Sequence, residues 1–243
     1  MLSVSRDSES LQNFSSKLTM SEITLFWGSG SIPCWRIMIT LEEKGLNYNS
    51  RLMSFEKKEH KSEEIMKLNP RGQLPTMTVG DDVINESFAA CEYLEIVYKD
   101  KGTCLYPPAS SAKQLSLVLQ RMHETCNIQQ KMVTNIIYYL WGNPNPDKEL
   151  LTKRHEELAA ELCRWENYMK ELKSTFLTGA DMTMADVMFF PYIAFGVRSG
   201  LQLGGRYPCL AAYYNMMKER PSVKKSWPPH WIDTPNNNVL ADV

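Results

Sequence analysis

The sequence predicts a small α/β domain followed by a larger domain built only of helices, in a chain of 243 residues. Two observations carry this prediction. Between 23 and 101, short runs of β-type residues alternate with helical patterns. From 112 onward, helical periodicity dominates and no strand candidate is found. The stretch 102–111, which contains TCLYPPAS, reads as a proline-bearing linker between the two domains.

The first domain is expected to cover 21–101 in the order β, α, β, α, β, β, α. ITLFW, at 23–27, is a short apolar run typical of a strand. After the glycine turn, Pro33 suits the first turn of a helix. Lys44 and Gly45 place a cation in the last turn and a glycine cap after it, so we expect the helix to end there.

A second strand is predicted over 48–54, and a short charged helix after it ends at Asn69-Pro70. PTMTV, the turn GDD and VIN then have the pattern of an antiparallel hairpin. Ser87 opens the last helix of the domain, FAACEYLEIVYKD.

The second domain is expected to cover 112–243. One long helix is predicted over 112–141, closed by GNPNP, and a second over 147–173. A third begins at Thr183, whose hydroxyl caps the helix while Asp186 returns a bond to the cap amide, as in a capping box. A tail with Trp227 and Trp231 follows.

Composition restricts the function classes. The formal net charge of −1 provides none of the basic field expected for a nucleic-acid partner. No apolar run approaches the roughly 20 residues needed to span a bilayer, and the Ser-rich segment 1–20 lacks the apolar centre of a secretory signal. We expect a cytoplasmic protein without a membrane partner, with 1–20 as a flexible extension. The six cysteines include no CxxC pair, so no zinc or other metal site is expected.

The glycine-rich turn GSGSIPC, at 28–34, is the most informative stretch. Pro33 occupies the third glycine position of a dinucleotide fingerprint, and a P-loop needs a GK pair that is absent. SIPC, at 31–34, instead has the outline of a redox CxxC motif whose first sulfur is replaced by oxygen. A serine hydroxyl at a helix N-terminus donates a hydrogen bond to a thiolate brought by a substrate. The turn therefore predicts a site that stabilises the sulfur of another molecule.

Other polar residues describe the rest of that ligand. A cis proline at Leu74-Pro75 turns backbone groups outward to pair with an extended peptide. Glu86 and Ser87, at a helix start, suit an amino-acid end with its carboxylate and ammonium groups. The opposite carboxylate is assigned to His60, Lys61 and Gln73. The ligand is thus a short peptide with a central thiol and charged ends.

These residues resemble the glutathione transferase family over nearly the whole chain from Met20 onward. Ser31 in SIPCWR looks like the catalytic serine of its serine-type classes, and QLP and ESFAA match its peptide- and glutamate-binding segments. TMADV at 183–187 and ERPSVKKSW at 219–227 are similar to its helical-domain signatures. GSGSxPCWR, NPRGQLP and SWPPHW most resemble the rho class of aquatic animals, a fish glutathione S-transferase A-like pattern.

The resemblance implies a thioredoxin-like domain followed by an α-helical domain, and a homodimer. It implies glutathione as co-substrate and a small hydrophobic electrophile as its partner in xenobiotic detoxification. By the same resemblance, the middle of the long helix faces the sulfur, which nominates His123 and Cys126, with Trp231 as a lid. Trp27 stands where a tyrosine-type enzyme carries its phenol, so a serine must bind the sulfur.

Alternatives remain open at this point. Ser29 lies two residues before Ser31 and is the other candidate for the catalytic hydroxyl. Cys34 is interpreted as buried packing, although a thiol reductase acting through it is one alternative function. A non-catalytic protein that binds glutathione or hydrophobic ligands is another. His155 and His230 are interpreted as surface histidines.

Overall fold

The computed structural model describes residues 22–108 and 110–243, so the predicted extension at 1–20 lies outside the described residues. The first domain is built on a four-stranded sheet with the order β2-β1-β3-β4. Its strands are β1 (Ile23–Trp27), β2 (Asn49–Leu52), β3 (Thr76–Val79) and β4 (Asp82–Ile84). β1 pairs in parallel with β2 and antiparallel with β3, and β3 pairs antiparallel with β4. The predicted order of strands and helices and the predicted hairpin are confirmed.

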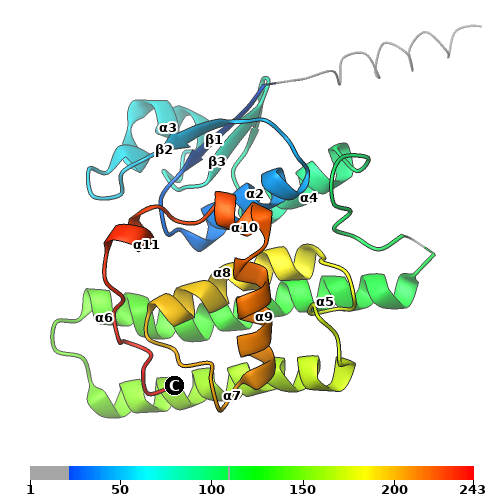
Figure 1. Cartoon of the computed structure of the whole chain (residues 1–243). Helices are drawn as coiled ribbons and strands as arrows, with labels where there is room; N and C mark the ends of the chain where they lie inside the picture. Colours follow the sequence, from blue (N-terminus) through cyan, green and yellow to red (C-terminus); the bar gives the residue numbers. More distant parts are fainter. Residues whose placement is uncertain (1–21, 109) are drawn as a thin grey trace, which may run out of the picture.

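Helices cover this sheet, as Figure 1 shows. They are α2 (Ile32–Glu43), the 3₁₀ turn η1 (Glu59–Lys61), α3 (Glu63–Leu68) and α4 (Ser87–Val97). α2 and α4 pack against each other on one side of the sheet. Leu25 of β1 and Met77 of β3 are completely buried because these strands are central and shielded by the helices. The peptide bond between Leu74 and Pro75 is cis, as expected.

The second domain is helical. It contains α5 (Ala112–Ile128), η2 (Gln129–Tyr138), α6 (Tyr139–Gly142), α7 (Lys148–Leu172), α8 (Met184–Arg198), α9 (Pro208–Lys218), α10 (Pro221–Lys225) and α11 (His230–Asp233). The capping box of Thr183 and Asp186 is present at the start of α8. α8 is buried almost throughout and forms the centre of this domain. No described helix is long and apolar enough to cross a membrane.

The predicted helix over 112–141 is helical throughout, but its middle has a different geometry. η2 is a π-helix, in which each amide bonds to the carbonyl five residues earlier. Gln129 and Tyr138 lie nine residues apart, which is two and a half turns of an α-helix and would put them on opposite faces. The wider π-helix makes about two turns over the same length, so both residues face the same side. No pattern in the sequence predicted this.

Polar contacts join the two domains. Glu43, at the end of α2, accepts hydrogen bonds from Arg220 Nε (2.5 Å) and Nη2 (2.7 Å), and also from Ser222 and Thr103. Trp35 Nε1 donates to Ser226 Oγ at 2.9 Å. The chain near α10 therefore returns to pack on α2 (Figure 1). The fold as a whole is a thioredoxin-like domain followed by an α-helical domain, as predicted.

Candidate functional site

A cleft of about 1100 Å³ lies where the two domains meet, next to the turn that follows β1. This volume is at the upper end of the range usual for small-molecule sites. The lining from the first domain is mainly polar or backbone and comprises Ser29, Gly30, Ser31, Ile32, Pro33, Arg36, Phe55, His60, Lys61, Gly72, Gln73, Leu74, Pro75, Asn85, Glu86, Ser87 and Phe88. The helical domain contributes Gln129, Val133, Ile137, Tyr138, Leu140, Trp141, Tyr192, Phe195, Arg198, Ser199, His230, Trp231, Thr234, Asn237 and Val239.

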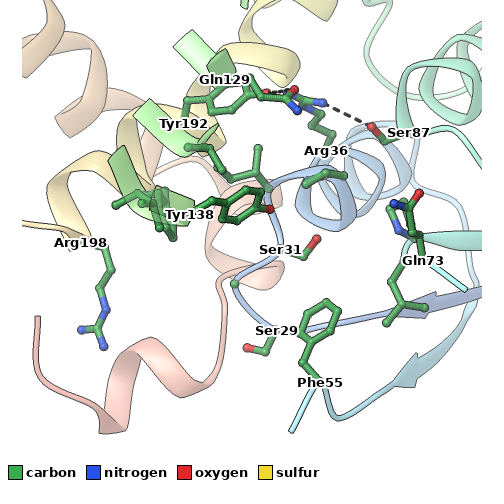
Figure 2. Close-up of a pocket in the computed structure, with 18 of the residues that line it drawn as sticks. Ser29, Ser31, Arg36, Phe55, Gln73, Ser87, Gln129, Tyr138, Tyr192 and Arg198 are labelled. Carbon is green, nitrogen blue, oxygen red and sulfur yellow. Dashed lines mark hydrogen bonds between the residues drawn. The ribbon is translucent and has the colours of Figure 1, made fainter. Parts of the chain in front are cut away.

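Ser31 is the N-cap of α2. Its backbone is extended, with φ −73° and ψ 114°, and its Oγ accepts a hydrogen bond from the Cys34 amide at 3.4 Å. Because the oxygen accepts this bond, the hydroxyl proton remains available for another group. Figure 2 shows the hydroxyl turned toward the part of the cleft that holds Gln73 and Ser87. A thiolate in this part of the cleft would meet both a hydroxyl donor and the positive end of a helix dipole.

Ser29 has a different environment. Its Oγ lies 2.5 Å from His230 Nδ1, and Figure 2 shows it turned away from Gln73. The imidazole sits close over Gly30, where an added Cβ would lie 2.7 Å from His230 Cε1. Gly30 also has a φ of +77°, which favours glycine. Ser29 therefore ties the turn to the C-terminal segment, and His230 is exposed, as expected, and also lines the cleft.

The residues assigned to the middle and the two ends of a peptide ligand all line the cleft: His60, Lys61, Gln73, Leu74, Pro75, Glu86 and Ser87. The loop before Pro75 is held by Asn69, whose Nδ2 donates to the Gln73 carbonyl at 3.0 Å. Lys61 Nζ donates to the Arg71 carbonyl at 3.0 Å. Residues that are far apart in the chain thus lie close together in the fold, as predicted.

Cys34 is completely buried behind the turn, and its Sγ accepts from the Gly28 amide at 3.5 Å. Burial raises the pKa of its thiol to about 11, and hydrogen bonding in the turn, including that of the Gly28 amide, offsets only part of this rise. The thiol is therefore protonated and unreactive at neutral pH. This agrees with the packing interpretation.

The wall opposite Ser31 is apolar and aromatic. Val133, Ile137 and Tyr138 of η2 line it together with Trp141 of α6 and Phe195 of α8. Tyr138 is oriented toward the cleft in Figure 2, on the side that the π-helix gives it. Trp141 is 74 % exposed, so a large apolar surface is available to a ligand here.

The three residues nominated for this wall have different locations. Trp231 lines the cleft, but it is only 9 % exposed because it packs edge-on against Trp35 and Trp227. His123 and Cys126 are exposed and do not line the cleft, and the His123 ring stacks on Phe88 with centroids 6.0 Å apart. His123 and Cys126 lie outside the cleft because they come before Gln129, where the part of the long helix that lines the cleft begins.

Sequence reasoning also missed lining residues. Arg36, Tyr192 and Gln129 meet in the upper part of the cleft in Figure 2, where the Tyr192 hydroxyl donates to Gln129 Oε1 at 2.8 Å. A signal for Arg36 existed, since an arginine in an otherwise apolar helix face, CWRIMI, is unusual for a buried position. Gln129 and Tyr138 had no such signal. Among the described residues, no three His, Cys, Asp or Glu side chains gather as metal ligands would.

The fold and cleft define a two-domain protein whose cleft has a polar side, from the first domain, and an apolar wall, from the second. Family models described as the N-terminal and C-terminal domains of glutathione S-transferase match residues 31–96 and 130–226. Glutathione S-transferase A of Pleuronectes platessa is 49% identical over 91% of this chain and 99% of its own length. The chain therefore belongs to the glutathione S-transferase family, and it is an enzyme of that family.

Solved structures of other proteins are consistent with this family assignment. A glutathione S-transferase from the Antarctic clam Laternula elliptica has a TM-score of 0.84 and 44% identity, covering 91% of this chain and 99% of that one. A glutathione transferase of Phanerochaete chrysosporium, URE2P8, solved with oxidized glutathione, has a TM-score of 0.75 and 24% identity, covering 88% and 96%. The second likeness shows the fold alone.

Proposed function

We propose that this enzyme conjugates the thiolate of glutathione to small hydrophobic electrophiles, and that the Ser31 hydroxyl stabilises the thiolate. The observation that carries the proposal is the position of Ser31, whose hydroxyl faces the polar part of the cleft at the N-terminus of α2. The apolar wall of η2 and α8 lies across the cleft from it. Thiol and electrophile are thus brought together in one site, which lowers the entropic part of the barrier.

The interactions at Ser31 are strong enough to lower the pKa of a bound thiol. An ordinary thiol has a pKa of about 8.5, and lowering it by about two units requires roughly 2.7 kcal/mol of preferential thiolate stabilisation. A hydrogen bond to a charged acceptor contributes about 1.5 to 3 kcal/mol. The dipole and free amides of a helix N-terminus add up to about 1 kcal/mol. Ser31 and α2 therefore account for the shift.

The ends of glutathione fit the two polar groups of the cleft. Glu86 takes the ammonium of the γ-glutamyl end, and Ser87 takes its carboxylate at the start of α4. His60, Lys61 and Gln73 take the glycyl carboxylate. Leu74, before Pro75, pairs with the backbone of the cysteinyl residue.

The electrophile site is proposed to be formed by cleft-lining apolar residues: Val133, Ile137, Tyr138, Trp141, Phe195 and Trp231. An aromatic and aliphatic wall of this kind favours apolar, planar molecules. His123 and Cys126 do not enter this proposal, because they lie outside the cleft.

Other properties of the protein are proposed from its sequence motifs and composition. They are membership of the rho class, a homodimer, a cytoplasmic location and a role in xenobiotic detoxification, without a nucleic-acid partner. The proposed domains cover 21–101 and 112–243, joined by the linker 102–111.

Ser31→Ala tests the catalytic role, and Ser29→Ala is its matched control. We expect Ser31→Ala to raise the pKa of bound glutathione, followed by thiolate absorbance, by about one to two units, because it removes a charge-assisted hydrogen bond. Conjugation of a generic aryl halide falls with it at neutral pH. Ser29→Ala leaves the thiol pKa unchanged, since Ser29 faces His230.

Undiminished conjugation in Ser31→Ala, with a loss in Ser29→Ala, would transfer the role to Ser29. Tight glutathione binding without turnover of any electrophile in a panel would instead indicate a non-catalytic binding protein.

A further inference from the structure

The indole N–H of Trp231 is a buried hydrogen-bond donor without an acceptor. Three other tryptophans are also buried, and each donates its Nε1–H to a side-chain oxygen: Trp27 to Ser50, Trp35 to Ser226 and Trp165 to Glu161. Trp231 is 9 % exposed, yet within 22–108 and 110–243 its Nε1 has no such partner. Because a buried indole N–H is normally paired, this one points to an acceptor supplied by a ligand.

The unpaired N–H faces the glycine-rich turn. A Cβ added to Gly30 would lie 3.1 Å from Trp231 Nε1. Because Gly30 has no side chain, nothing from the turn covers this nitrogen, and both residues line the cleft. Ser31, which is proposed to bind the sulfur, is the next residue, and neighbouring Cα atoms lie about 3.8 Å apart. The donor is therefore close to the proposed place of the thiolate.

Aromatic contacts fix the position of the indole. Its ring lies edge-on to Trp35 and Trp227, with centroids 5.4 and 5.8 Å away, and 6.3 Å from the ring of Phe195. A donor that is held in place before the reaction needs no reorganisation when charge develops on its acceptor. An indole nitrogen donates and does not accept, so its partner must be an acceptor such as oxygen.

We propose that the Trp231 Nε1–H is a catalytic hydrogen-bond donor to the electrophile. It binds an oxygen of the electrophile that gains negative charge while the thiolate forms its bond to carbon. The inference rests on the proposed function, since it assumes that glutathione and an electrophile occupy this cleft together.

Addition to an α,β-unsaturated ketone illustrates the step. The sulfur forms a bond to the β-carbon, the alkene π pair forms a new π bond between the α-carbon and the carbonyl carbon, and the carbonyl π pair moves onto the oxygen. The indole N–H stabilises this enolate oxygen and keeps its own proton. Water then protonates the α-carbon, and the remaining hydroxide combines with the proton that the glutathione thiol released. No group leaves, and nothing is oxidised or reduced overall.

The kinetic test compares two electrophiles that differ in this oxygen. Benzylideneacetone has a carbonyl group conjugated to the reacting carbon, and benzyl bromide has no oxygen. Trp231→Phe keeps an aromatic ring but lacks the N–H. We expect it to lower kcat/KM for benzylideneacetone by about 10- to 100-fold, the range for a hydrogen bond to a charged acceptor. We expect kcat/KM for benzyl bromide to stay within roughly twofold, because that reaction places no charge on an oxygen.

Trp227→Phe is the matched control. Trp227 belongs to the same aromatic cluster, with its ring centroid 5.2 Å from that of Trp35 and 5.8 Å from that of Trp231, but it does not line the cleft. We expect Trp227→Phe to leave the ratio of the two kcat/KM values unchanged.

Binding of an unreactive ketone provides a measurement that needs no turnover. Benzylacetone is the saturated relative of benzylideneacetone, and butylbenzene has the same carbon chain without the oxygen. In nitrogen–proton NMR spectra, the indole resonance of Trp231 is the one that is missing from Trp231→Phe. With glutathione present, we expect this resonance of the wild-type enzyme to move downfield when benzylacetone is added, and not when butylbenzene is added.

An equal loss for both electrophiles in Trp231→Phe, or no loss for benzylideneacetone, would overturn the inference. An equal loss with a raised pKa of bound glutathione would mean that the N–H binds the sulfur instead. A Trp231 resonance that does not move with benzylacetone, or moves equally with butylbenzene, also overturns it. If Trp231→Phe does not fold, this measurement on the wild-type enzyme still decides, with the resonance assigned through the backbone. A wild-type enzyme that conjugates neither electrophile contradicts the proposed function, and the inference fails with it.

Discussion

Trp231→Ala should detach the C-terminal segment from the cleft. Trp231 is 9 % exposed, and its ring lies edge-on to Trp35 and Trp227, with centroids 5.4 and 5.8 Å away. His230 precedes it directly, and Thr234, Asn237 and Val239 follow it; all four line the cleft. The aromatic cluster thus anchors the segment at α11, and the completely buried Leu240 anchors it near its end.

The size of the effect follows from the contacts that remain. Truncating a buried tryptophan to alanine costs about 3 to 5 kcal/mol. The other ties near the cleft are the Ser29–His230 bond and the bonds of Arg198 Nη1 to Thr234 O (2.7 Å) and Asn236 Oδ1 (2.6 Å). These bonds are exposed, and each contributes about 1 kcal/mol. Local opening should therefore become at least about a hundredfold more frequent, since 1.36 kcal/mol corresponds to a factor of about ten.

Hydrogen exchange measures this opening. The amides of Trp231, Ile232 and Thr234 bond to the carbonyls of Pro228, Pro229 and His230, so their protection reports on α11. We expect these amides to lose protection in Trp231→Ala, while those of β1 keep theirs. We also expect KM for an apolar electrophile to be higher in Trp231→Ala than in the wild-type enzyme. Ile232→Ala is the control, because that neighbouring side chain is 75 % exposed.

Unchanged protection of the α11 amides in Trp231→Ala would refute the reasoning. It would mean that the exposed hydrogen bonds and the buried Leu240 hold the segment without the Trp231 ring. Equal loss of protection in Ile232→Ala would show that the effect is not specific to the aromatic cluster.

Further predictions concern Cys34 and Glu43. Because burial raises the pKa of the Cys34 thiol to about 11, we expect iodoacetamide to leave Cys34 unlabelled in the native enzyme and Cys34→Ala to retain conjugation; labelling followed by peptide mass analysis checks this. Burial alone would raise the pKa of the Glu43 carboxyl, but hydrogen bonds from Arg220, Ser222 and Thr103 outweigh it and hold the pKa below its usual range. The ionised Glu43 carboxylate therefore contributes fully to the free energy of unfolding above the unfolded-state pKa of about 4.3. This contribution is lost as pH falls through the lower pKa of the folded state. We expect Glu43→Gln to lower the free energy of unfolding at neutral pH by roughly 2 to 3 kcal/mol and this difference to shrink below about pH 4, as measured by urea titration; a constant difference would contradict the assignment.

Much of the fold could be predicted because its signals are local. The alternation of strands and helices, the hairpin around the GDD turn and the capping box of Thr183 and Asp186 all depend on residues close in sequence. The π-helical geometry of η2 could not be predicted, because its apolar pattern is also that of an α-helix. That difference decides whether Tyr138 faces the cleft.

The candidate site likewise contains residues that local sequence motifs predicted and residues that they did not. Ser31, Gln73 and Ser87 were found because each belongs to a motif with a local backbone role, such as a cap or a turn. His230 is exposed, as expected, but its position over Gly30, 200 residues earlier in the chain, could not be predicted from the sequence. Arg36 was overlooked because its counterpart, Ser87, is distant in sequence.

By itself, the sequence determined the two domains and the serine at the head of the first helix, and it predicted the polar residues that line one side of the cleft. Only the tertiary structure decided which serine faces the polar part of the cleft, since Ser29 and Ser31 lie two residues apart and differ only in the partners that the fold brings to them. It also decided which part of the long helix forms the apolar wall and where the buried charge of Arg36 lies. The physical reason is that caps and turns depend on neighbouring residues, whereas side-chain direction across a cleft depends on the packing of distant segments.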